Sequence, residues 1–427
     1  MTRNKFLNIF IILLFLCTTI SAQEERSVIL PEDSVAAILP EDSIAAEDTL
    51  TIDSITTLPW PESLQMTLDR IIEKSTFLNT SQLGLLIYDL TADSVLYAKG
   101  EKQTLRPAST MKLITAITAL DKLGGAYLFK TRLCYTGEII DSTRVLKGDI
   151  YCVGGMDPKL GRDDLRDFAR CIKELGIDTI RGNVYADRSM KDADLLGEGW
   201  CWDDDNPQLS PLVYGKKDNL MKNFLQTLSD RGIFLDGEEG VRTCPGNATE
   251  LCMRTHSIEQ VLQKMMKDSN NLFAESMYYQ IGLSQGKPAT AKKAQAVEKA
   301  LIRKIGMQNK PYRLADGSGL SLYNYLSAEM EVAFLRYAYA NANIYEYLYP
   351  ALPIAGVDGT LDKRMQKTPA ARNVHAKTGT LTGISSLAGY CTASNGHELC
   401  FAIINQGVMK ASVAKAFQDK VCVAMCK

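Results

Sequence analysis

The sequence lacks features that mark several common classes of protein. Its 48 basic and 50 acidic residues nearly cancel, and the net charge of −2 provides no positive field for phosphate groups, so nucleic acid is not an expected partner. Its three histidines, His256, His375 and His397, do not have the spacing of metal ligands. HExxH and CxxC patterns are also missing, which argues against a zinc peptidase and a thioredoxin-like protein. We therefore expect neither a metal nor a cofactor.

The N-terminal apolar run is too short for a membrane anchor. It extends from Phe6 to Cys17, whereas a membrane-spanning helix needs about 20 apolar residues. Arg3 and Lys5 precede the run, and small residues at 21 and 22 follow it, which is the pattern of a cleaved export signal. We expect residues 1–22 to be removed and the mature chain to be exported to the periplasm.

Cysteine is not scarce, but its pairing is open. Eleven cysteines include Cys17 of the signal, which leaves ten in a compartment that permits disulfides. Cys244 and Cys252 flank one turn-like segment, and Cys391 and Cys400 flank another, so each pair could lie across a hairpin. Buried, unpaired thiols are an equally good interpretation, because a chain of this size has enough core without cross-links.

Residues 23–56 differ in composition from the rest of the chain. They are acidic and contain a tandem repeat in which residues 29–37 return as residues 38–46. Two copies are too few for a solenoid, which needs about three repeats to bury a shared face. We therefore expect this segment to be a flexible, disordered tether.

The remaining sequence predicts an α/β fold. Period-two runs and turn signals at both ends of this region indicate strands, and helical periodicity follows Pro107 until Gly124-Gly125 ends it. An N-terminal hairpin and three C-terminal strands would form one sheet, with the terminal helices on one face. The expected strands are 83–90, 94–98, 373–377, 384–392 and 398–405, and the expected helices include 258–267, 272–280 and 410–427.

Three short motifs carry the candidate chemistry. They occur in the order Ser109-Thr110-Met111-Lys112, Ser269-Asn270-Asn271 and Lys377-Thr378-Gly379. The SxxK pattern also starts at Ser284 and Ser412, but only Ser109 lies at the start of a predicted helix, where free N–H groups favour negative charge on a reacting oxygen.

The first motif is suited to nucleophilic catalysis. Ser109 and Lys112 are three residues apart and share one face of a helix. A serine hydroxyl needs a base beside it, and a lysine can be that base if desolvation and a second cation lower its pKa. Lys377 is the candidate second cation. The alternative for an isolated SxxK is a solvated helix lysine.

The other two motifs could bind substrate and move protons. Ser269 could pass a proton to a leaving amine while the Asn271 amide holds a substrate carbonyl or Lys112, although Ser-Asn-Asn alone is also an ordinary N-cap cluster. Lys377 and Thr378 are expected at the end of a strand, where they could bind a carboxylate, with Gly379 allowing close approach of substrate backbone. A Tyr-x-Asn version at 339–341 lies in a run spaced like a buried helix and is taken as core.

The ordered SxxK, SxN and KTG motifs resemble those of penicillin-binding proteins and serine β-lactamases. Further segments are similar to class C low-molecular-mass penicillin-binding proteins, the D-alanyl-D-alanine carboxypeptidase/endopeptidases. The likeness runs from about residue 83 to the end of the chain. The segments that carry it are 148–158, 315–321, 353–361 and 376–383.

This resemblance implies a fold and a set of roles. The fold is a penicillin-binding transpeptidase domain, an antiparallel sheet flanked by helices, formed by residues 57–125 and 255–427, with a smaller domain inserted at 126–254. A smaller insertion nested within that domain is expected to be reduced or absent. The implied roles are Ser109 as nucleophile, Lys112 as base, and Ser269 and Asn271 as proton relay and positioning groups. Lys377 and Thr378 would bind a carboxylate. The backbone N–H groups of Ser109 and Thr380 would form the oxyanion hole.

The implied activity is cleavage of D-alanyl peptide bonds in peptidoglycan through an acyl-enzyme on Ser109. Its partners would be peptidoglycan peptides and β-lactam antibiotics, and the sequence does not indicate an oligomeric state. One alternative is a β-lactamase-like hydrolase, for which no water-activating group is evident. Another is an inactive wall-binding module, against which the intact Ser109, Lys112 and Lys377 argue.

Overall fold

The computed structural model describes residues 58–202 and 206–427. The predicted signal and tether lie outside these residues. None of the helices in the described ranges combines the length and apolar character needed to cross a membrane.

A five-stranded antiparallel sheet joins the two ends of the described chain. Its strand order is β12-β13-β14-β1-β2, so the N-terminal hairpin lies beside the three C-terminal strands as the sequence predicted. The junction is between β1 and β14, where Gln82 is opposite Gln406. The strands are β1 (Gln82–Asp89), β2 (Ser94–Lys99), β12 (His375–Leu381), β13 (Ile384–Thr392) and β14 (Glu398–Gln406).

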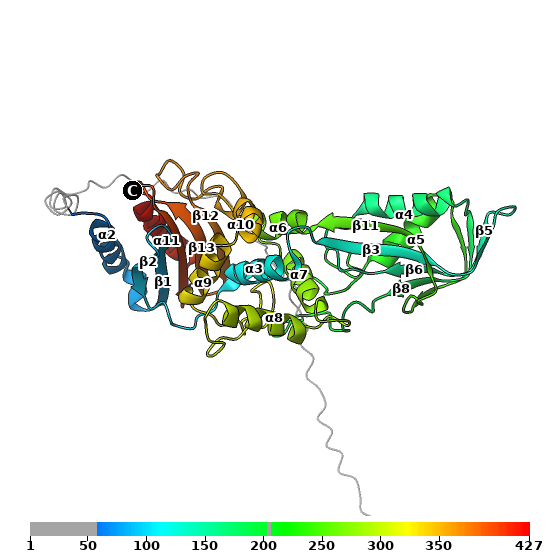
Figure 1. Cartoon of the computed structure of the whole chain (residues 1–427), viewed down its shortest axis with the longest axis horizontal. Helices are drawn as coiled ribbons and strands as arrows, with labels where there is room; N and C mark the ends of the chain where they lie inside the picture. The colour runs from blue at the N-terminus through cyan, green and yellow to red at the C-terminus, as the bar shows by residue number, and fades with distance from the viewer. Residues whose placement is uncertain (1–57, 203–205) are drawn as a thin grey trace, which may run out of the picture. The chain divides into compact units, whose positions relative to one another are not determined.

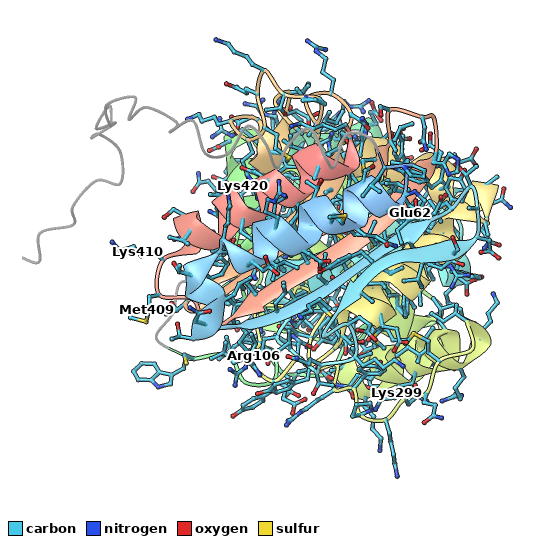
Figure 2. All side chains as sticks on the ribbon, turned by 90° about the vertical axis from the view of Figure 1, so that its left-hand side faces the viewer. Glu62, Arg106, Lys299, Met409, Lys410 and Lys420 are labelled. Atoms are coloured by element: carbon cyan, nitrogen blue, oxygen red, sulfur yellow. The ribbon has the colours of Figure 1, made fainter. Side chains whose placement is uncertain are left out.

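Helices cover both faces of this sheet because its central strands are apolar on both sides. Along β13 every residue but the last is buried. On one face, α2 (Glu62–Glu73) packs against α11 (Ala411–Met425), over a core that includes Phe401 and Val421. Figure 2 shows these two helices lying side by side across the sheet. This agrees with the expected placement of the terminal helices.

The other face carries a larger helical layer built around α3 (Met111–Leu123). Ten consecutive residues of α3, Met111 to Leu120, are buried, which is the pattern of a helix surrounded by other elements. Figure 1 shows α3 among the helices of this layer. The others are α6 (Ile258–Lys267), α7 (Asn271–Leu283), α8 (Ala291–Lys304), α9 (Ala328–Tyr339) and α10 (Ala342–Ala351). The expectation for Tyr339 was wrong: it ends α9 and is 37 % exposed.

Residues 128–257 form two further sheets with a hydrophobic core of their own. One has the order β10-β8-β6-β3-β11 and the other β4-β5-β7-β9. Two amphipathic helices, α4 (Arg162–Glu174) and α5 (Leu220–Asp230), contribute Phe168 and Phe224 to that core. The strands are β3 (Leu128–Tyr135), β4 (Glu138–Ile140), β5 (Val145–Lys147), β6 (Ile150–Val153), β7 (Thr179–Arg181), β8 (Val184–Asp187), β9 (Phe234–Asp236), β10 (Glu239–Val241) and β11 (Thr249–Ser257).

The structure contradicts both hairpin pairings considered for the cysteines. Cys391 is opposite Leu399, and Cys400 is one residue further along β14, so the two side chains lie on opposite faces of the sheet and in different cores. A shift of one residue in a strand reverses the face of its side chain. Cys244 packs near Cys134, and Cys252 packs against the core that α4 covers.

Candidate active site

Ser109 lies in a tight turn that leads into α3. The turn is a short 3-10 helix, η2 (Ala108–Thr110), in which the hydroxyl of Thr110 donates to the Pro107 carbonyl at 2.8 Å. Ala108 has a left-handed φ of 50°. Ala108 and Thr110 are buried, whereas Ser109 is partly exposed. The turn therefore presents the Ser109 hydroxyl to solvent from a rigid, buried support.

The Lys112 ammonium group lies against that hydroxyl. Its Nζ is 2.9 Å from Ser109 Oγ, 2.8 Å from Asn271 Oδ1 and 2.7 Å from the Ser318 carbonyl oxygen. Three contacts match the three N–H donors of an ammonium group, and the side chain is fully buried. The structure thus brings together Ser109, Lys112 and Asn271 from two of the three motifs.

Burial changes the proton affinity of Lys112. Desolvation lowers the pKa of Lys112 to about 7, although the carboxylates of Asp316 and Glu275 oppose this shift. Of the two causes named from the sequence, desolvation and a second cation, the leading one is therefore desolvation by burial. Near pH 7 a substantial fraction of Lys112 is a neutral amine with a lone pair for the Ser109 proton.

The second motif connects α6 to α7. Ser269 has a left-handed φ of 54°, and Asn270 is the N-cap of α7, with its side chain accepting from the Phe273 N–H at 3.2 Å. The N-cap interpretation is thus correct for Asn270. Its neighbours point elsewhere, because Asn271 contacts Lys112 and the Ser269 hydroxyl contacts Lys377 Nζ at 2.8 Å.

The third motif lies within β12 and not at the end of a strand. β12 continues to Leu381 because it remains paired with β13 through Thr378, Gly379 and Thr380. Lys377 is fully buried, and desolvation together with repulsion from Lys112 holds the pKa of Lys377 well below its usual range. Thr378, on the opposite face, forms a hydrogen bond of 2.7 Å with Thr360 Oγ1.

Gly379 lies where the Ser109 turn meets β12. A Cβ at this position would lie 2.1 Å from Ser386 Oγ, 2.7 Å from the Pro107 carbonyl oxygen and 2.9 Å from Ser109 N. The missing side chain therefore allows the Ser109 turn to pack directly on β12. In this structure the backbone of the Ser109 turn approaches Gly379 closely.

The outer edge of β12 offers backbone donors beside Ser109. β12 is the edge strand of its sheet, and the Ala376 N–H donates away from β13 to the Pro353 carbonyl at 2.9 Å. N–H groups along a strand alternate in direction, so those of Thr378 and Thr380 point to the same outer edge. The Ser109 N–H and the Thr380 N–H thus come from two elements in contact.

A buried carboxylate network holds the loop that binds Lys112. Glu275 accepts from the Gly317 N–H at 3.1 Å and the Ser318 N–H at 2.8 Å. Asp316 accepts from the Gly319 N–H and from the Trp200 indole, both at 2.8 Å. Burial, with a contribution from Asp316, raises the pKa of Glu275 to about 8. The sequence analysis assigned no role to these residues, although a glutamate in the apolar helix α7 was a usable signal.

The remaining candidates do not join this site. Ser284 is the exposed C-cap of α7 and Ser412 is exposed in the first turn of α11. Ser284 is also the serine of a Gly-x-Ser-x-Gly sequence at 282–286, but a nucleophile elbow places its serine between a strand and a helix. His375 stacks on Tyr349 with ring centroids 4.2 Å apart.

No group of side chains that could hold a metal ion occurs within residues 58–202 and 206–427.

Comparison with known proteins agrees with this geometry. Two overlapping stretches, residues 64–214 and 209–426, match the model of the D-Ala-D-Ala carboxypeptidase 3 (S13) family. The chain belongs to that family. It is therefore a serine-type D-Ala-D-Ala carboxypeptidase.

Curated relatives of this D-Ala-D-Ala carboxypeptidase carry the same name. It is 27 % identical over 459 residues to a D-alanyl-D-alanine carboxypeptidase of an Actinomadura species, with 85 % of this chain and 84 % of the relative covered. It is 24 % identical to a D-alanyl-D-alanine carboxypeptidase of Haemophilus influenzae, with 75 % and 84 % covered. Its fold matches the crystal structure of penicillin binding protein 4 from Haemophilus influenzae, with a TM-score of 0.76 at 22 % identity over 83 % of this chain and 98 % of that one.

Proposed function

We propose that this carboxypeptidase cleaves D-alanyl peptide bonds in peptidoglycan stem peptides, as a carboxypeptidase and an endopeptidase, through an acyl-enzyme on Ser109. The observation that carries the proposal is the 2.9 Å contact between Lys112 Nζ and Ser109 Oγ, made by a fully buried amine. It fits a serine nucleophile with a lysine base beside it.

The acylation step begins with proton transfer. Neutral Lys112 keeps two N–H donors, which bind Asn271 Oδ1 and the Ser318 carbonyl, and its lone pair then faces the Ser109 hydroxyl. As the amine takes the proton, Ser109 Oγ attacks the carbonyl carbon of the D-alanyl bond. The developing oxyanion accepts hydrogen bonds from the N–H groups of Ser109 and Thr380.

Collapse of the tetrahedral intermediate breaks the C–N bond. The leaving amine needs a proton, and the Ser269 hydroxyl, which accepts a hydrogen bond from Lys377 Nζ, is suited to deliver it. Ser269 would be reprotonated with the proton that Lys112 took from Ser109, which returns Lys112 to the neutral amine. In deacylation the neutral Lys112 takes a proton from water, the water oxygen attacks the ester carbonyl carbon, and Lys112 returns that proton to Ser109 Oγ as the C–O bond breaks. The lowered pKa of Lys112, about 7, lets this amine be neutral when it accepts the proton and lets the ammonium give the proton up again at neutral pH.

The substrate would lie along the outer edge of β12 and extend the sheet by one strand. Thr378 and Thr380 share one face of β12, where their hydroxyl groups can bind the carboxylate next to the scissile bond. Lys377 is buried behind them, where its Nζ donates to the Ser269 hydroxyl and to the Thr378 carbonyl. Substrates that keep this carboxylate include D-Ala-D-Ala termini and cross-links through a side-chain amine, which is why both activities are proposed.

The location and division of the chain follow from the same proposal. A peptidoglycan enzyme acts outside the cytoplasm, in agreement with the export signal predicted at residues 1–22. Residues 57–125 and 255–427 would form the catalytic domain, since the site draws on η2, α3, α7 and β12. The region 126–254 would be an inserted domain, which the separate core of α4 and α5 supports.

Labelling with a fluorescent penicillin tests the nucleophile. The wild-type enzyme should be labelled covalently, and Ser109→Ala should not be, because the acyl bond requires that oxygen. Ser284→Ala and Ser412→Ala are matched controls, since each removes the serine of another SxxK sequence, and both should be labelled as the wild type is.

Undiminished labelling of Ser109→Ala would overturn the assignment, and absence of labelling in folded wild-type protein would favour a wall-binding module. Analysis of the products from purified muropeptides then measures the two peptidase activities. Rapid release of the hydrolysed penicillin, without muropeptide cleavage, would instead support a β-lactamase.

A further inference from the structure

The fold brings six of the ten described cysteines together in three pairs. All ten are free thiols in the structure. The pairs are Cys134 with Cys244, which share one small cluster, Cys171 with Cys252, on a helix and a strand in contact, and Cys391 with Cys426, which share one hydrophobic core. In each pair the two thiols belong to different parts of the chain, so their proximity arises from tertiary packing.

Cys171 and Cys252 meet where a helix packs on a strand. Cys171 is in the last turns of α4 and Cys252 is in β11, and these two elements are in contact. Cys252 also packs against the core to which α4 contributes Phe168 and Ile172. The two thiols are in hydrogen-bonding contact, and both side chains are only partly buried.

Cys134 and Cys244 meet on the other side of the same sheet. Cys134 of β3 forms a small cluster with Tyr151, and Cys244 packs against that cluster. Cys244 follows β10, and its N–H donates to Asp187 Oδ2 at 2.9 Å, which fixes this segment next to the sheet. The thiols of Cys134 and Cys244 are in hydrogen-bonding contact.

Cys391 and Cys426 join the C-terminal end of α11 to the catalytic sheet. Cys391 is buried in β13, and Cys426 is the C-cap residue of α11, which packs on that strand. Both belong to the same hydrophobic core, and their thiols are in hydrogen-bonding contact. Cys422, one turn earlier in α11, is a third thiol in this core.

We propose that these pairs are disulfide bonds in the exported enzyme: Cys134–Cys244, Cys171–Cys252 and Cys391–Cys426. In each reaction two thiols lose two protons and two electrons and form one S–S bond, while an external disulfide, such as oxidised glutathione or a thiol-disulfide oxidoreductase, is reduced to two thiols. The proposal rests on the proposed export, because disulfides persist outside the reducing cytoplasm. It does not depend on the role of Ser109.

Burial indicates when these bonds form. It raises the pKa of the Cys134 thiol to about 12, and the neighbouring Cys426 thiol, together with burial, raises the pKa of Cys391 well above its usual range. The thiolate is the species that attacks a disulfide, so the folded, reduced protein should exchange slowly at these sites. We expect the bonds to form as the chain folds, before these two thiols are enclosed.

Peptide mapping tests the three pairings directly. The mature enzyme is reduced and unfolded, refolded with reduced and oxidised glutathione, alkylated, and digested without reductant. Mass spectrometry should find the three linked peptide pairs and four alkylated cysteines, Cys152, Cys201, Cys400 and Cys422. Ten alkylated cysteines, or links between other partners such as Cys391 with Cys422, would overturn the proposal. Because mapping detects only sulfur bonding, its result is separate from penicillin labelling of Ser109.

Thermal unfolding gives a second test with matched variants. Wild-type protein refolded with reductant should melt roughly 3 to 10 °C below protein refolded with oxidised glutathione, because cross-links restrict the unfolded chain. This gap should shrink in the double variant Cys171→Ser/Cys252→Ser. It should be unchanged in Cys201→Ser, which removes an exposed thiol outside the three pairs. Equal melting temperatures of oxidised and reduced wild type, with both folded, would contradict the proposal.

Discussion

The catalytic centre and the region of residues 128–257 use charged side chains in opposite ways. At the centre, Lys112 and Lys377 are 0 % exposed and Glu275 is 1 % exposed. The other region also has ion pairs that lie in solvent, such as Arg181 with Asp236, whose side chains are 58 % and 66 % exposed. Exposed pairs contribute only about 0.2 to 1 kcal/mol, whereas a buried charge is costly unless it is fully paired. The comparison indicates that the buried charges are retained for chemistry.

The largest expected effect comes from removing the buried amine. Lys112→Ala should lower the rate of penicillin acylation by roughly 10² to 10⁴, because loss of a general base typically has an effect of that size. The variant should remain folded by circular dichroism, since two of the three contacts of Nζ are to a side-chain amide and a hydroxyl that can bind water. Stopped-flow or gel-based acylation rates measure the effect. A rate within a few-fold of wild type would remove Lys112 as the base.

Changing the pH should reproduce part of this effect without a mutation. The active form of Lys112 is the neutral amine, and its pKa is lowered to about 7. The acylation rate should therefore rise with pH through about 7 and level off above it, and should fall about tenfold per unit well below it. The measurement is acylation rate against pH on folded enzyme. A profile that is flat from pH 5 to pH 9 would show that Lys112 does not titrate in this step.

A smaller effect is expected from the carboxylate that faces Lys112. Ionised Glu275 opposes the lowering of the Lys112 pKa, but with a pKa of about 8 it is only partly ionised near pH 7, so Glu275→Gln should move the midpoint of the acylation profile to lower pH by less than about one unit. Glu298→Gln is the matched control, because Glu298 is an equally buried glutamate on α8 that does not shift Lys112. A purely structural role for Glu275 would lower the melting temperature and leave the midpoint in place.

The smallest effect should come from the exposed ion pairs. Arg181→Ala removes a pair with Asp236 and should change the free energy of unfolding by no more than about 1 kcal/mol, with no change in acylation rate. Denaturant unfolding and penicillin labelling measure both. If Arg181→Ala lowered the free energy of unfolding by several kcal/mol, the exposed ion pairs would not differ in energy from the buried charged groups of the catalytic centre.

The parts of the fold that the sequence predicted were those with strong local patterns. The bounds of β13 and α6 agree with the prediction, because continuous burial marks one and a regular apolar stripe marks the other. β12 was predicted too short, since Thr378, Gly379 and Thr380 resemble a turn until their pairing with β13 is known.

The residues of the candidate site were likewise predicted where a local motif marks them and missed where none does. The three motifs named the residues that meet at Ser109, because motif order carries that information. The network around Lys112 was missed, since Glu275 binds N–H groups 42 and 43 residues further along the chain, and no local pattern records such a contact. The cysteine partners were missed for the same reason.

The position of β1 between β2 and β14 has a consequence for biogenesis. The side chains of Gln82 and Gln406, which pair these strands, are 324 residues apart in sequence. Contacts between such distant segments form late, because the long intervening chain must first be closed. Ser109 and Lys112 are synthesised early, yet β12, which supports their turn, arrives only with the last segment of the chain. The Ser109 turn therefore cannot pack on its supporting strand until residues more than 250 positions further along the chain have been made.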